Sequence, residues 1–194
     1  MADDRSFRLT PILLEAGFVV LGVFLALVAN EWRANANARE RAALARTGII
    51  EEIRTNREAV QHMHRYHAHL VDTLRSFTAE RPPPSPRVYR EGFANAAATL
   101  STAWDAANAT DAVSHMAFED VLAFSELYAQ QQRYERVAEE VGAVIFSEIF
   151  DHGSFGVAEN YRSLSDINGS LLYLERGLLA AYDSVLARLD HTDA

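Results

Sequence analysis

The stretch "PILLEAGFVVLGVFLALVANEW", residues 11–32, is an almost unbroken apolar run with one carboxylate, Glu15, near its start. A Thr-Pro pair opens it, which favours a helix start because Thr caps the first turn and Pro loses no hydrogen bond there. Residues 12–29 would form about 27 Å of helix, close to the roughly 30 Å thickness of a bilayer's hydrocarbon. Trp32 then falls at the far interface, where its amphipathic ring is favoured. The run therefore predicts a transmembrane helix over residues 11–32.

Two other interpretations of this run are a buried core helix and a cleaved signal peptide. A core helix would need cover on all sides, and the other expected helices are amphipathic with limited apolar surface. A signal peptide is favoured by the small residues "ANA" at 34–36 and by Arg5 and Arg8 in the short tail, residues 1–10. However, the run is longer than a typical signal core and continues into helix-forming sequence. We therefore expect an uncleaved, single-pass anchor.

The bulk composition limits the function classes. The chain has 194 residues, so the part after the anchor suffices for one domain with a real core. It has no cysteine, and all 18 basic residues are arginine, which excludes cysteine nucleophiles and lysine Schiff bases. The net charge of −9 argues against a nucleic-acid partner.

After the anchor, residues 33–81 form a stalk that becomes the first helix of a bundle. The segment up to Ala45 is rich in alanine, which favours helix but offers few large core residues. A stripe with helical spacing then follows, made of Ile49, Ile53, Val60, Met63, His67, Leu70, Leu74 and Phe77. We expect the helix to end at "ERPPPSPR", residues 80–87, because consecutive prolines forbid helical geometry before them. Residues 82–87 are the predicted linker.

The remaining chain, residues 88–190, is predicted to be helical. The expected helices cover residues 93–109, 118–150 and 157–189, with a short turn near 108–116 and a break at "DHGSFG", residues 151–156. The inner side of the expected helix over residues 118–150 is predicted to carry Phe118, Val121, Tyr128, Ala138, Val141, Ile145 and Ile149. The last has a heptad-like row of Val157, Tyr161, Leu164, Leu171, Leu178, Tyr182, Val185 and Leu189. The fold class is therefore all-α, an antiparallel bundle of about four helices.

Four histidines stand in "HMHRYHAHL", at positions 62, 64, 67 and 69. Imidazole is a common metal ligand, but on a helix only His64 and His67 form a pair, and they would need a further ligand from another helix. A solvated polar face with His67 at the helix seam explains the pattern equally well. Both interpretations stay open, and we expect no metal or other cofactor.

No constellation in the chain indicates catalysis. Asp151, His152 and Ser154 have the residue types of a hydrolase triad, but they are neighbours in a turn and lack an oxyanion hole. We therefore name no catalytic residue and expect that the protein is not an enzyme.

A tryptophan among alanines in "STAWDAANAT" marks a region that is either a core anchor or a pocket wall. In the second interpretation, Trp104 would line a ligand pocket together with Tyr128 and Gln131.

The segments "LLEAGFVVLGVFLALVANEW", "GIIEEIRTN", "TAWDAANATDAVSHM" and "FEDVLAFSELYAQQQ", in this order, resemble a family of uncharacterised bacterial single-pass membrane proteins with a domain of unknown function. In that family the anchor opens with Glu and closes with Trp, as Glu15 and Trp32 do here. The resemblance implies membrane attachment and a helical domain, and it supplies no catalytic residues. The tail "MADDRSFRLT" is less basic than is usual in such proteins.

The anchor itself has a face of small residues. Gly22, Ala26 and Ala29 permit close approach of a second helix in lipid, and Glu15 lies on the same stripe. Glu15 either snorkels to the headgroups or lies in an interface between helices. Together with Trp32 these residues are the predicted membrane-helix interface, and the expected partners are the lipid bilayer and a second copy or another membrane protein.

These features predict a membrane-anchored helical module for oligomerisation or protein interaction. The alternative is a membrane-anchored sensory, ligand-binding or metal-binding bundle. The expected location is the bacterial inner membrane. Arg33, Arg39, Arg41 and Arg46 outnumber the two arginines of the tail, which favours a cytoplasmic C-terminal domain by the positive-inside rule.

Overall fold

The computed structural model describes residues 9–77 and 83–192, and within these ranges the chain is helical and contains no strand. Four α-helices and two short 3₁₀ turns follow one another. They are α1 (Leu9–Arg75), η1 (Pro86–Val88), α2 (Thr102–Ala109), η2 (Ala112–His115), α3 (Phe118–Glu159) and α4 (Tyr161–Thr192). The predicted all-α class is confirmed.

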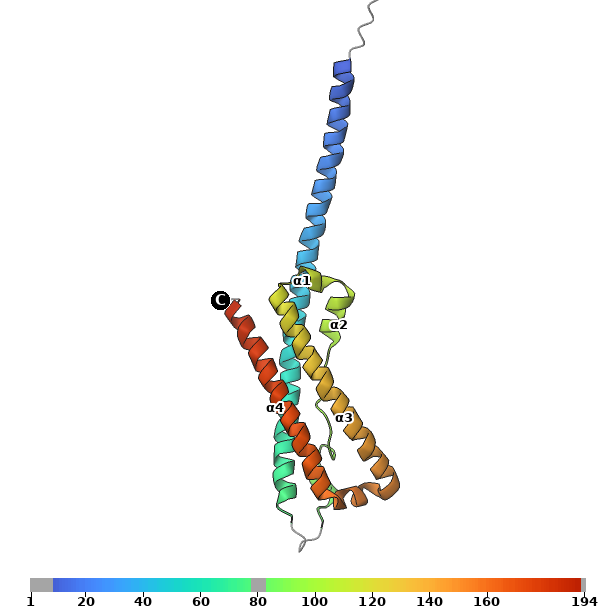
Figure 1. Ribbon diagram of the computed structural model, residues 1–194, viewed down its shortest axis with the longest axis vertical. Helices are drawn as coiled ribbons and strands as arrows, with labels where there is room; N and C mark the ends of the chain where they lie inside the picture. The colour runs from blue at the N-terminus through green and yellow to red at the C-terminus, as the bar shows by residue number, and fades with distance from the viewer. Residues whose placement is uncertain (1–8, 78–82, 193–194) are drawn as a thin grey trace, which may run out of the picture.

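Helix α1 is the spine of the molecule (Figure 1). Its 67 residues span about 100 Å at 1.5 Å per residue. The upper part stands alone, with every described side chain from Gly17 to Ala36 exposed. Lower down, Ala38 and Ala42 are the first buried residues, and the row from Ile49 to Leu74 is buried as predicted, with Phe77 half-buried beyond it. The bundle therefore begins about one and a half turns after Trp32.

Helices α3 and α4 form a hairpin against the lower part of α1 (Figure 1). Helix α4 runs antiparallel to both and contacts both, so it is the central layer of the bundle. Six members of its predicted apolar row are buried and Tyr161 is half-buried, while the first member of the row, Val157, is buried near the end of α3. In α3, Tyr128, Ala138 and Ile145 are buried, but the expected core residue Phe118 is 74% exposed because it starts the helix outside the packed face.

The expected helix over residues 93–109 is wrong in its first half, because only Thr102–Ala109 is helical. Residues 94–101 are non-helical, since core side chains satisfy their backbone in place of a helical ladder. The Leu100 N–H donates to Asn56 Oδ1 at 2.8 Å, and Asn56 Nδ2 donates to the Leu100 carbonyl at 2.7 Å. The Ala97 N–H donates to the Tyr134 hydroxyl at 2.8 Å.

Two helix ends also differ from expectation. Helix α1 ends at Arg75, before the prolines, where the Ser76 hydroxyl donates to the Thr73 carbonyl at 2.7 Å. Residues 78–82, including the start of the predicted linker, lie outside the described residues. Helix α3 continues to Glu159, and the predicted break is a kink at Gly153, whose φ of 69° suits glycine.

Candidate functional site

The five predicted anchor residues, Glu15, Gly22, Ala26, Ala29 and Trp32, are all exposed on the free part of α1. A Cβ added at Gly22 would meet no atom within 4 Å. One described helix is long and apolar enough to cross a membrane, and none of its apolar stretch is buried. No element in the described ranges therefore covers this stretch as a core would, and any interface on it requires a partner from outside the chain.

The aromatic region predicted as a pocket wall or core anchor is packed. Trp104 stacks on Tyr128 with ring centroids 5.5 Å apart and an interplanar angle of 7°. The Tyr128 hydroxyl donates to Glu52 Oε1 at 2.6 Å, while the Ala103 N–H donates to Glu52 Oε2 at 2.8 Å. Burial, together with the bond to Glu52, raises the pKa of Tyr128 far above its ordinary value. The rings of Trp104 and Tyr128 therefore pack against each other. Glu52 of α1 links this helix to α2 and α3 through its two hydrogen bonds.

Gln131, the third predicted pocket residue, is a fully buried hub of hydrogen bonds. Its Oε1 accepts from the Tyr182 hydroxyl at 2.8 Å and from Asn56 Nδ2 at 3.1 Å. Its Nε2 donates to the Leu100 carbonyl at 3.1 Å and to Glu135 Oε1 at 3.0 Å. The residue joins α1, α3, α4 and the extended segment, so its role in this structure is to hold the bundle together.

The histidine pair meets a carboxylate that sequence reasoning missed. Glu175 of α4 is fully buried, and its Oε1 lies 2.8 Å from Nδ1 of the fully buried His67. The Tyr134 hydroxyl donates to the same oxygen at 3.1 Å, and His64 Nδ1 lies 3.7 Å from Oε2. We call His64, His67, Tyr134 and Glu175 the buried polar cluster. His67 occupies the helix seam, as one of the two sequence interpretations held.

No group of three His, Asp or Glu side chains that could hold a metal ion occurs in the described residues. In the buried polar cluster the His67 nitrogen contacts the carboxylate directly. His67 Nε2 and Glu175 Oε2 have no hydrogen-bond partner within the part of the chain that the structure describes. Leaving such atoms unpaired costs stability, so the surrounding apolar packing must offset it.

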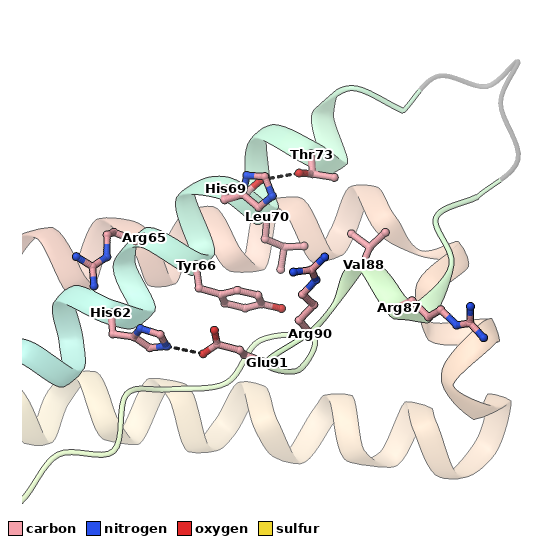
Figure 2. A pocket seen from close by; sticks show the side chains of 10 residues that line it. All are labelled: His62, Arg65, Tyr66, His69, Leu70, Thr73, Arg87, Val88, Arg90 and Glu91. Atoms are coloured by element: carbon pink, nitrogen blue, oxygen red, sulfur yellow. Dashed lines mark hydrogen bonds and ion pairs between the residues drawn. The ribbon is translucent and has the colours of Figure 1, made fainter.

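A second polar region lies on the surface, between the lower part of α1 and η1 with the loop that follows it (Figure 2). This cavity of about 570 Å³ is what we call the arginine groove. Its lining residues are His62, Arg65, Tyr66, His69, Leu70, Thr73, Arg87, Val88, Arg90 and Glu91. His62 and His69, seven residues apart and so on one side of the helix, both line it. The three arginines were not singled out in the sequence because they come from two separate segments.

The tip of the α3–α4 hairpin exposes aromatic side chains. Phe146, Phe150 and Phe155 are 73%, 85% and 75% exposed, and we call them the distal phenylalanine row. The neighbouring residues Asp151, His152 and Ser154 are also exposed, so these triad-like residues do not share a pocket.

The chain matches no protein-family model, no curated protein and no solved structure. The resemblance to single-pass membrane proteins of unknown function therefore stays a prediction.

Proposed function

We propose that this protein is a single-pass, membrane-anchored helical module that associates with other copies of itself. One observation carries the proposal: the exposed apolar stretch and the bundle spine are parts of a single helix, α1. Exposing that many apolar side chains to water is unfavourable by roughly 25 cal/mol per Å² of apolar surface, and a bilayer removes this cost. Because the first buried residue is Ala38, the bundle would sit close to the membrane surface.

The distal phenylalanine row supports the part of the proposal that concerns self-association. Large exposed apolar patches on soluble domains mark interaction sites. Copies anchored in one bilayer present this row at the same height above the membrane. A symmetric pair then brings the two rows together, as an isologous interface requires.

The anchor is tested by extracting membranes of expressing cells with alkaline carbonate and measuring the intact mass of the retained protein. We expect the full-length chain in the membrane pellet. A mass that lacks the sequence up to Ala36 would instead identify a cleaved signal peptide, and release into the supernatant would refute the anchor.

Self-association is tested by measuring the protein mass of the full chain in mild detergent by size-exclusion chromatography with multi-angle light scattering. We expect a dimer that is weakened by Gly22→Leu, by Glu15→Ala, or by Phe146→Ser together with Phe150→Ser. Phe118→Ser is the matched control, since Phe118 is equally exposed at the other end of α3. A monomer in the unmodified protein would refute self-association.

The sidedness of the bundle is part of the same proposal. We place the bundle in the cytoplasm at the bacterial inner membrane, because the arginines that follow Trp32 outnumber those of the tail. Protease added to spheroplasts should spare the bundle and should digest it after lysis. Digestion before lysis would reverse the assignment.

A further inference from the structure

We propose that the arginine groove binds a soluble polyanion that carries phosphate or carboxylate groups. This site goes beyond the anchoring and self-association proposed above, because none of its lining residues belongs to the anchor or to the distal phenylalanine row.

The charge of the groove favours an anionic ligand. Side chains of Arg65, Arg87 and Arg90 make no hydrogen bond or ion pair with any other residue that the structure describes. The one carboxylate of the groove, Glu91, lies 2.8 Å from His62 Nε2. The groove therefore concentrates uncompensated positive charge on a chain whose net charge is −9. A local excess of positive charge attracts anions even though the chain as a whole is negative.

The arrangement of the arginines favours a ligand with more than one anionic group. Figure 2 shows Arg90 reaching from the loop toward α1, between Tyr66 and Val88, with Arg65 and Arg87 on opposite sides of it. The guanidinium groups are spread along the groove and do not converge on one point. A ligand with several anionic groups can satisfy them together, and each guanidinium can bind a phosphate or carboxylate with two parallel hydrogen bonds.

Contacts within the chain hold the loop of the groove against α1. The Tyr66 hydroxyl donates to the Gly92 carbonyl at 2.6 Å, and the Tyr89 ring packs against Phe93 with centroids 4.5 Å apart and an interplanar angle of 44°. Burial raises the pKa of Tyr66, which keeps its hydroxyl a donor. These contacts fix the loop on α1, so a ligand does not have to order it. The volume of about 570 Å³ lies within the range of small-molecule sites, about 300–1,000 Å³.

The position of the groove along α1 indicates the source of the anion. Arg65 is 33 residues (65 minus 32) beyond Trp32 along one continuous helix, which is about 50 Å at 1.5 Å per residue. Headgroups of the anchoring bilayer cannot reach that far, and their field fades over a Debye length of about 8 Å. A soluble polyanion therefore fits the position better than a lipid headgroup.

The test is a calorimetric titration, in which sodium tripolyphosphate is added to the full-length protein in uncharged detergent and the heat of binding is measured. We expect saturable binding that weakens as salt rises and that is at least about tenfold weaker in Arg87→Gln combined with Arg90→Gln. Arg136→Gln is the control, because it removes one exposed arginine of α3 outside the groove. Circular dichroism shows whether the variants keep their helices.

Two results would overturn the proposal. Absence of binding at millimolar tripolyphosphate refutes the site, and equal binding by the groove variant and the control refutes its location. A parallel arm adds phosphatidylglycerol to the detergent micelles as competitor. Displacement of tripolyphosphate by this lipid at equal phosphate concentration would contradict a soluble ligand and assign the groove to headgroups.

Discussion

The two halves of α1 share one uninterrupted helix but require different surroundings. From Gly17 to Trp32 apolar residues occur on all faces and every side chain is exposed. From Ile49 to Leu74 the apolar residues form one stripe, and that stripe is buried. Helical geometry is the same in both, so the difference lies in the surroundings that each pattern favours: an apolar medium on all sides for the first, which we propose is lipid, and partner helices on one side for the second. A perturbation of either half should therefore leave the other intact.

The largest expected effect is alkaline unfolding of the bundle with the anchor still helical. Burial raises the pKa of Tyr128, Tyr134 and Tyr182 well above the ordinary value of about 10, and nearby carboxylates add to the shift. Above that value the unfolded chain loses these protons and the folded chain keeps them, so stability falls as pH rises. Three residues at about 1.4 kcal/mol each give about 4 kcal/mol per pH unit.

This loss is measured by circular dichroism and near-ultraviolet tyrosinate absorbance between about pH 9 and 12. We expect ionisation of Tyr128, Tyr134 and Tyr182 and loss of bundle helicity to occur in one transition. Ionisation of these three hydroxyls near the ordinary value, with the helices intact, would contradict their burial.

The second effect concerns the buried polar cluster. Glu175→Ala removes the partner of His67 and of the Tyr134 hydroxyl, and we expect it to lower the free energy of unfolding by about 3–5 kcal/mol. Glu148→Ala, on the exposed side of α3, should change it by less than about 0.5 kcal/mol. Thermal melts of the full chain in detergent measure both. Equal melting temperatures would show that the cluster does not hold α1 to α4.

The third effect concerns the exposed apolar half of α1, residues 17–32. Val20→Arg places a charge near the middle of the anchor, at a cost of about 2.5–3.5 kcal/mol for insertion into a bilayer. We expect less protein in the membrane fraction and an unchanged melting temperature of the bundle. Val20→Leu is the matched control and should behave like the unmodified chain. A bundle destabilised by Val20→Arg would mean that the first half packs on protein.

The smallest effects are expected when glycine is replaced by alanine at two positions, Gly92 and Gly169. Gly92 has a φ of 102°, and an added Cβ would clash with the Asn95 side chain, so Gly92→Ala should destabilise by about 1–2 kcal/mol. Gly169 lies inside α4 with no atom within 4 Å of an added Cβ. Gly169→Ala should stabilise the bundle by about 0.5–1 kcal/mol. Denaturant titrations measure the free energy of unfolding of both variants. A change of the same sign in the two variants would contradict the loop geometry of the groove.

The success of prediction from sequence depends on the range of the interactions involved. The buried rows of α1 and α4 depend on spacing within one helix, and both were predicted residue by residue. The extended segment was missed because Leu100 is bonded by Asn56, which lies 44 residues away. Glu175 was missed for the same reason, since its partner His67 is 108 residues distant. The arginine groove joins two segments across the proline-rich connection, and no local pattern marks such a pair.

The central claim is that one helix changes its solvent from lipid to protein, and spin-label accessibility along α1 tests it most directly. The chain contains no cysteine, so single cysteines at residues 18–27 and 50–59 can be labelled one at a time in phosphatidylcholine nanodiscs. We expect oxygen to reach the label more readily than a water-soluble nickel chelate at every position of 18–27. Over 50–59 the chelate should reach the exposed positions, with minima at Glu52, Ile53 and Asn56. Access of the chelate to one face of residues 18–27 would contradict the account.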